Sequence, residues 1–339
     1  MHPARMTRRA LLPAALAALL AAALAPARAP HAAHADAAQD PPQQQPQPAP
    51  VRLNVLVTDE KGRPFTDLKQ EDFQVTENGA AQAVNFFSRG PRPLSYVLVV
   101  DNSGSLRQLM PFIIETGLSF VANHAEGDEA SVVRFVAANN IRLMQDFTAE
   151  RRLLERALHD MYVEGGQTAL LDAVYVAVQH IEKHRPADRE RLRAVVVMTD
   201  GEERGSSVSR DELVTLLRRT GVQVFSIGYV KLLGNEGGFI LRSPREQAVK
   251  LLETLAAESG GRAFFPKNNS ELPIAVEEIA RAMRAQYVLG YTPTNAAHDG
   301  SFRKLKVSVN APAGRKLLVT TRAGYKAPGM TNAEKKKKP

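Results

Sequence analysis

The chain has 339 residues, no cysteine and a formal net charge of +8. Without cysteine it has no disulfide framework, thiolate zinc site, thiol nucleophile or cysteine-linked lipid. Four arginines lie within the first 35 residues and Lys335 to Lys338 lie near the end, so the body between them is close to neutral. Because basic residues are not interleaved with aromatic ones, we expect no nucleic-acid partner.

Residues 1–35 have the pattern of a secretory signal peptide. Arg5, Arg8 and Arg9 precede an Ala/Leu-rich run over residues 10–24, and small residues follow. The apolar run is short for a bilayer, so we expect cleavage and no stable membrane span afterwards, with a single membrane anchor as the alternative. The sequence therefore predicts an exported protein, periplasmic or secreted. The paired arginines leave general and twin-arginine export both open.

The next two segments differ in composition and in the pattern of apolar residues. Residues 36–50 are rich in proline and glutamine, which is typical of an extended linker. Over residues 51–90, apolar and polar residues alternate between short turns such as Asp59–Gly62 and Glu77–Gly79. This pattern predicts a small N-terminal β unit.

Between residues 91 and 285, strand-like runs alternate with helical periodicity. The predicted strands are Ser95–Val100, Ala130–Phe135, Ile141–Gln145, Ala194–Thr199, Val222–Tyr229 and Arg262–Phe265. The predicted helices are Leu109–Asn123, Glu150–His159, Leu170–His184, Asp211–Thr220, Pro244–Ser259 and Leu272–Gln286. Two helices begin with capping boxes, at Ser209 and Ser243. The alternation predicts an α/β fold: a doubly wound, mostly parallel sheet flanked by helices, with small β units before and after it.

After residue 285 the sequence again has the residue pattern of β-strands. The predicted strands Tyr287–Tyr291, Phe302–Val309 and Lys316–Arg322 are separated by turn residues. They form a C-terminal β unit over residues 286–327, and we expect it to pair with the first β unit. Residues 328–339 are predicted to be a disordered basic tail.

Oxygen-bearing side chains follow or precede elements of the α/β segment at three places. Asp101, Ser103 and Ser105 follow the first strand, Thr168 precedes a helix, and Asp200 follows the fourth strand. Ligands of open α/β sheets bind outside the carboxyl ends of the strands. Hard divalent cations prefer carboxylate and hydroxyl oxygens. The residues therefore point to a cation site, with simple helix caps as the alternative.

The same residues carry a resemblance to a known family. Asp101-x-Ser103-x-Ser105, Thr168 and Thr199-Asp200-Gly201 resemble the metal-ion-dependent adhesion site (MIDAS) of von Willebrand factor A (VWA) domains. The resemblance covers residues 91–285. The β units at either end resemble those of a bacterial group of exported proteins related to these domains.

The resemblance implies a role for each residue. Ser103, Ser105 and Thr168 would coordinate the metal, while Asp101 and Asp200 would hold it directly or through water. It implies Mg2+, with Mn2+ or Ca2+ as alternatives. It also implies one open coordination position, filled by an acidic side chain of a protein ligand, so that the cation mediates protein–protein interaction or adhesion.

Other charged residues near these loops can be interpreted without a metal-binding or catalytic role. Asp172 is interpreted as a helix-start charge favoured by the helix dipole. Glu202 and Glu203 are interpreted as a charged rim that tunes partner choice. His180 and His184 have metal-binding spacing, yet they lie near a helix end where cationic residues are favoured.

Enzyme readings find little support in the motifs. An aspartate after an apolar strand can accept a phosphoryl group, but such enzymes need a second acid two residues later, where this chain has Ser103. P-loop, G-x-S-x-G and G-x-G-x-x-G motifs are absent from the sequence. We therefore predict a binding module that is not an enzyme. The alternatives are a structural component of an envelope assembly with a stabilising metal, and a metal-assisted hydrolase.

Overall fold

The computed structural model describes residues 49–184, 190–236, 242–311 and 315–329, which lie in one compact unit. The predicted signal peptide, the linker up to residue 48 and the lysine tail lie outside the described residues. The helices are α1 (Met110–Ala122), α2 (Arg151–His159), α3 (Leu170–His184), α4 (Arg210–Thr220), α5 (Pro244–Ser259) and α6 (Leu272–Arg284). The strands of the central sheet are β5 (Leu94–Asp101), β6 (Glu129–Phe135), β7 (Ile141–Thr148), β8 (Leu192–Thr199), β9 (Gln223–Gly228) and β10 (Ala263–Phe264).

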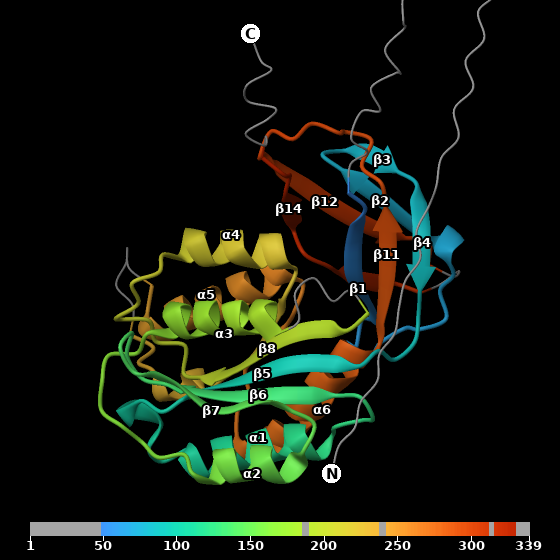
Figure 1. The fold of residues 1–339 in the computed structure, drawn as a ribbon. Helices are drawn as coiled ribbons and strands as arrows, with labels where there is room; N and C mark the ends of the chain where they lie inside the picture. The colour runs from blue at the N-terminus through green and yellow to red at the C-terminus, as the bar shows by residue number, and fades with distance from the viewer. Residues whose placement is uncertain (1–48, 185–189, 237–241, 312–314, 330–339) are drawn as a thin grey trace, which may run out of the picture. The chain divides into compact units, whose positions relative to one another are not determined.

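The central sheet has the order β10-β9-β8-β5-β6-β7, and only β7 runs antiparallel to its neighbour (Figure 1). All eight residues of β5 are buried, as expected for a strand covered on both faces. Helices α1, α2 and α6 cover one face of the sheet, and α3, α4 and α5 cover the other, each over its own apolar cluster. The predicted α/β fold class is thus confirmed.

The elements of this segment lie close to their predicted bounds. Helices α3 and α5 have the predicted limits, and both capping boxes are present. The Ser209 and Ser243 hydroxyls each accept the backbone N–H three residues later, at 3.2 Å. The starts of α4 and α5 could be predicted from the sequence because a capping box involves only neighbouring residues.

The two end segments form joint sheets. One sheet has the order β13-β1-β11-β4 and the other β14-β12-β2-β3. Their strands are β1 (Val51–Asp59), β2 (Phe73–Glu77), β3 (Ala80–Gln82), β4 (Val84–Ser88), β11 (Gln286–Tyr291), β12 (Phe302–Val309), β13 (Leu317–Thr320) and β14 (Gly324–Lys326). Strand β1 pairs with β11, and β2 pairs with β12, so the expected pairing of the two ends is present. Strand β14 was not predicted, because three residues give no readable alternation.

A buried carboxylate joins these two sheets. Glu77 on β2 is 2% exposed and its Oε2 accepts hydrogen bonds from the Tyr291 hydroxyl on β11, at 2.7 Å, and the Tyr325 hydroxyl on β14, at 2.8 Å. Burial, and secondly the bond to Glu77, raises the pKa of Tyr291, so this hydroxyl remains a donor. The contact therefore crosses from one sheet to the other through a satisfied polar pair.

Removing one donor tests this link. We expect Tyr291→Phe to lower the free energy of unfolding by about 1 to 2 kcal/mol, because Glu77 would stay buried with one tyrosine partner fewer. Urea denaturation measures the change. Tyr175→Phe on α3, whose hydroxyl has no hydrogen-bond partner among the described residues, is the control. Equal stability of Tyr291→Phe and the control would contradict a role for this bond.

Candidate metal site

Strands β5 and β8 bring two of the predicted loops together. They are parallel neighbours with Val100 opposite Met198, so both end at the same edge of the sheet. Asp101 is the last residue of β5, and a 3-10 turn over Gly104–Leu106 tightens the loop after it. After β8, Gly201 has φ +81°, and a side chain there would approach Ala248 Cβ to 2.9 Å. The Thr-Asp-Gly turn therefore requires its glycine.

Four of the five predicted residues form one chain of polar contacts. The Ser103 and Ser105 hydroxyls are 3.1 Å apart, and Ser105 Oγ donates to Asp200 Oδ2 at 2.6 Å. The Ser103 backbone N–H donates to Asp101 Oδ1 at 2.9 Å. Asp101, Asp200 and Ser103 are buried, whereas Ser105 is exposed. The cluster thus runs from the buried sheet edge out to the surface.

Thr199 orients the buried end of this cluster. Its Oγ1 donates to Asp101 Oδ2 at 2.6 Å and accepts the Gly201 N–H at 2.9 Å. The sequence motif included Thr199 but assigned it no role. A hydroxyl between two aspartate-bearing loops fixes their relative position, as partners behind metal ligands commonly do.

Thr168 belongs to the third loop and is also buried. Its backbone carbonyl accepts the N–H groups of Arg204, at 2.9 Å, and Gly205, at 3.1 Å, in the loop that follows Asp200. The same third loop is bonded to the first, because the Glu164 N–H donates to the Asn102 carbonyl at 2.9 Å. Among the described residues, no hydrogen bond joins the Thr168 hydroxyl to the other four. Its part in the site remains a prediction.

The electrostatics of the cluster favour a cation. Burial, and secondly the charge of Asp200, raises the pKa of Asp101 to about 7, although hydrogen bonds from Thr199 and Ser103 oppose the shift. Neither aspartate has a cationic side chain within ion-pair distance in the described parts of the chain. Two neighbouring buried carboxylates without a counter-charge are costly, and a divalent cation would offset that cost.

The donor set fits a hard cation as well. Adjacent ligands of an octahedral Mg2+ are about 2.9 Å apart, given metal–oxygen distances of about 2.0–2.1 Å. The spacings of 3.1 Å between the two serine hydroxyls and 2.6 Å between Ser105 and Asp200 are close to this value. No group of three His, Cys, Asp or Glu side chains suited to a metal occurs among the described residues. A cation held here would therefore depend on the hydroxyls.

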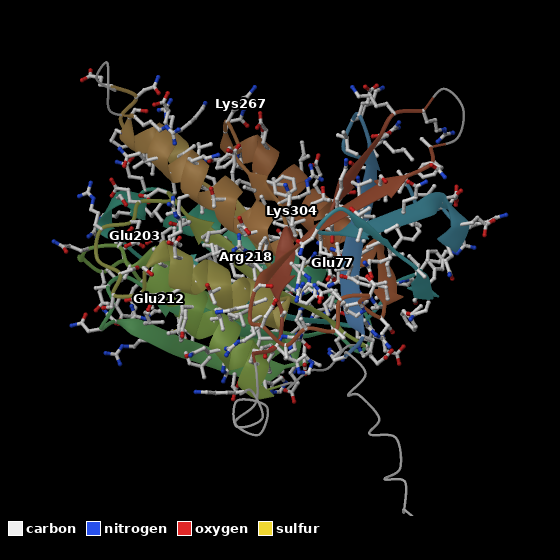
Figure 2. The ribbon with its side chains drawn as sticks, turned by 90° about the horizontal axis from the view of Figure 1, so that it is seen from above. Glu77, Glu203, Glu212, Arg218, Lys267 and Lys304 are labelled. Carbon is white, nitrogen blue, oxygen red and sulfur yellow. The ribbon has the colours of Figure 1, made fainter. Side chains whose placement is uncertain are left out.

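Two acids near the site have roles that the sequence did not predict. The Asp172 carboxylate accepts the N–H groups of Ser207, at 2.9 Å, and Val208, at 2.7 Å, so it holds the loop after β8 rather than only facing the helix dipole. Glu203, labelled in Figure 2, accepts the Leu171 N–H at the start of α3, at 2.9 Å. It is thus a helix cap, whereas Glu202 pairs with Arg204 at 2.6 Å. The interpretation of Glu202 and Glu203 as a charged rim that tunes partner choice stays a prediction.

The two helical histidines face different acids. His180 Nε2 lies 3.1 Å from Asp146, and His184 Nε2 lies 3.2 Å from Glu129. Both rings stack on Phe147, at centroid distances of 4.9 and 4.2 Å. Burial lowers the pKa of His180 most strongly, although Asp146 opposes this shift. The arrangement explains the i, i+4 spacing through stacking on one aromatic ring.

Fold and site together define an α/β domain of the doubly wound type with an oxygen-rich cluster at the carboxyl edge of its central strands. The chain belongs to the von Willebrand factor type A domain family, whose model matches residues 97–279. That match spans just over half of the chain and contains all five predicted site residues.

Similar proteins match a little more than half of the chain. An uncharacterized protein of Borreliella burgdorferi is 23% identical in an alignment over 202 residues that covers 55% of this chain and 57% of the relative. An aerotolerance-related membrane protein from Bacteroides fragilis, solved with multiple mutations to serines, is 19% identical with a TM-score of 0.42, covering 56% of this chain and all of that one. The conserved hypothetical protein BatB from Bacteroides thetaiotaomicron is 15% identical with a TM-score of 0.39, covering 56% and 98%. None of the described helices is both long and apolar enough for a membrane span.

Proposed function

We propose that this chain is an exported, non-enzymatic binding module whose VWA domain holds a divalent cation, Mg2+ or alternatively Mn2+ or Ca2+. Asp101, Ser103, Ser105, Thr168 and Asp200 would hold the ion. It would engage an acidic side chain of a protein partner at one open position. Membership of the VWA family supports a role in protein interaction. The signal-peptide pattern supports export.

The observation that carries the proposal is the convergence of oxygen donors from two loops. Ser105 Oγ contacts both Ser103 Oγ and Asp200 Oδ2, next to the buried carboxylate of Asp101. The uncompensated negative charge provides affinity for a cation. The exposure of Ser105 gives a partner access to it. A bound divalent ion supplies a Lewis-acidic contact for a carboxylate, and the protein's own residues position that contact at the surface.

Calorimetric titration of Mg2+ and Mn2+ into the purified protein tests the metal site. We expect saturable binding by the wild type. We expect binding about 10- to 100-fold weaker in the double variant Ser103→Ala/Ser105→Ala, which loses two oxygen donors and keeps both aspartates. The matched control is Ser119→Ala/Ser270→Ala. Among the described residues, both control hydroxyls bond within their own segment, to Glu115 and Asn268.

A peptide titration then tests the partner. A pool of peptides with a single aspartate or glutamate is added with and without Mg2+, beside a pool carrying asparagine or glutamine instead. Metal-dependent binding of the acidic pool alone supports the proposal. Metal binding and thermal stabilisation without any peptide response would favour a structural component with a stabilising ion. Mg2+-dependent hydrolysis of a phosphate ester would favour a hydrolase. No metal binding in the presence of either pool would refute the site.

A further inference from the structure

A second cleft lies at the opposite end of the central sheet from the metal site. It has a volume of about 340 Å³ and lies between the start of β1, the amino end of β8, the carboxyl end of α4 and strand β14. Eight of its lining residues are arginine or lysine, and Glu182 is the only acid among the lining residues that the structure describes. Such an excess of one charge in a concave surface focuses a positive potential.

Several of these arginines connect the helices and strands that line the cleft. Arg193 pairs with Glu182 and donates to the Thr220 carbonyl at the end of α4. Arg218, labelled in Figure 2, pairs with Glu258 at 2.7 Å, and its guanidinium lies 4.1 Å from the centre of the Phe302 ring on β12. These contacts fix α4 against β8 and β12. The rigid walls keep the remaining cations close together.

Three cations of the cleft are not neutralised in this way. Arg92, Arg219 and Lys326 have no carboxylate within ion-pair distance among the described residues. The Arg92 guanidinium donates to Asn54 Oδ1 at 2.8 Å, a neutral partner. Burial lowers the pKa of Arg92, Glu190 opposes that shift, and the positive charge of Arg52 adds to it. A partly buried guanidinium that faces another one is a position at which an anion gains affinity.

We propose that this cleft binds a small anion carrying two or more phosphate groups, either free in solution or as part of a lipid headgroup. The cleft is at the small end of the range of ligand sites, which excludes a bulky ligand and suits a compact, highly charged one. Guanidinium groups recognise phosphate through paired N–H donors, and Lys326 at the exposed rim adds a mobile positive charge. This inference goes beyond the proposed metal-dependent function and uses none of its residues.

Titration with inorganic pyrophosphate in the absence of divalent cations tests the site. We expect saturable binding by the purified protein that weakens as salt is added. The double variant Arg219→Glu/Lys326→Glu is expected to bind at least about tenfold more weakly. Both side chains are exposed, so their replacement leaves the core intact. If circular dichroism shows any loss of structure, Arg219→Gln/Lys326→Gln takes the place of this variant.

The matched control is Arg152→Glu/Lys267→Glu, which makes the same charge change at two exposed positions away from the cleft. We expect it to bind pyrophosphate within about twofold of the wild type. Co-sedimentation with vesicles that contain cardiolipin, whose headgroup carries two phosphates, compared with phosphatidylcholine vesicles, separates the two sources of phosphate. Vesicle binding that the cleft variant loses, without pyrophosphate binding, assigns the site to a lipid headgroup. Equal losses in both double variants, or no binding of either probe, would overturn the proposal without bearing on the metal site.

Discussion

Replacing Asp101 with asparagine is expected to raise the free energy of unfolding of the metal-free protein at pH 8 by about 2 to 4 kcal/mol. The cause is the raised pKa of Asp101, about 7 in the folded state against 3.8 for an ordinary aspartate, which results first from burial and then from the charge of Asp200. Asparagine keeps an oxygen that can accept from Thr199 or from the Ser103 N–H, but it carries no charge. A variant that removes a predicted metal ligand should thus stabilise the metal-free fold.

The sign of the pH dependence follows from the same shift. Below about pH 4 the carboxyl group is protonated in both the folded and the unfolded protein, so the two variants differ little. Between about pH 4 and pH 7 the Asp101 carboxyl ionises in the unfolded chain but stays protonated in the folded protein. The wild type therefore loses stability relative to Asp101→Asn. Above about pH 7 the loss is complete. Urea denaturation at pH 5 and pH 8 measures the gap, and Asp160→Asn, at an exposed position after α2, is the control.

Added Mg2+ should reverse this order. If Mg2+ binds the folded wild type alone, a concentration of about 1,000 times its dissociation constant adds about 4 kcal/mol of stability. Asp101→Asn should gain much less, because the ion would lose one charge of its site. A wild type that is more stable than Asp101→Asn at pH 8 even without metal would contradict the cost assigned to the buried carboxylate.

The proximity of Asp101 and Asp200 was predictable because it depends on strand direction. Apolar runs predicted β5 and β8, and parallel neighbours end at one edge, so the residues after each strand meet there. The roles of Asp172 and Glu203 were not predictable in the same way. Each is set by a contact between the loop after β8 and the start of α3, more than 30 positions apart. A single sequence does not show which of several acids faces which backbone N–H group.

The basic cleft shows the same limit on a larger scale. Its cations come from β1, the segment before β5, the start of β8, the end of α4 and the region of β14, so no local run of charge reveals it. Near α4, Arg218 and Arg219 have the usual composition of a helix end, where cations complement the dipole. Only the pairing of β1 with β11, and of β12 with β14, brings these positions to one surface. Local patterns therefore predicted the elements and the loops that carry Asp101 and Asp200, whereas the cleft required the tertiary arrangement.

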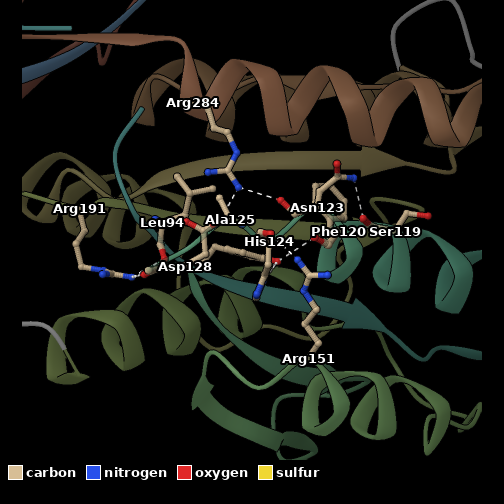
Figure 3. A network of polar contacts seen from close by, with 12 residues as sticks. Leu94, Ser119, Phe120, Asn123, His124, Ala125, Asp128, Arg151, Arg191 and Arg284 are labelled. Atoms are coloured by element: carbon tan, nitrogen blue, oxygen red, sulfur yellow. Dashed lines mark hydrogen bonds and ion pairs between the residues drawn. The ribbon is translucent and has the colours of Figure 1, made fainter. Parts of the chain in front are cut away.

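Asp128→Ala is expected to lower the free energy of unfolding by about 3 to 5 kcal/mol, more than Tyr291→Phe does. The Asp128 side chain is fully buried, and it accepts hydrogen bonds from the N–H groups of Leu94 and Ala125, each at 2.9 Å, and from Arg284 (Figure 3). It thereby joins the start of β5, the turn before β6 and the end of α6. Alanine would leave the Arg284 guanidinium and two backbone donors without their carboxylate. Asp160→Ala, at an exposed site, should change stability by less than about 0.5 kcal/mol.

The pH dependence and a double-mutant cycle separate this pair from simple packing. Burial raises the pKa of Asp128, but hydrogen bonds from Arg284, Ala125 and Leu94 outweigh it and lower the pKa below 3.8. The advantage of the wild type over Asp128→Ala should therefore be present above about pH 4 and be lost as the pH falls through the folded-state pKa. Arg284→Ala should also destabilise the protein, because it leaves the carboxylate buried without its cation. Losses in the double variant that equal the sum of the two single losses would show that the residues act independently. We expect the sum of the two single losses to be clearly larger than the loss in the double variant. Either single change leaves the remaining charge without its partner.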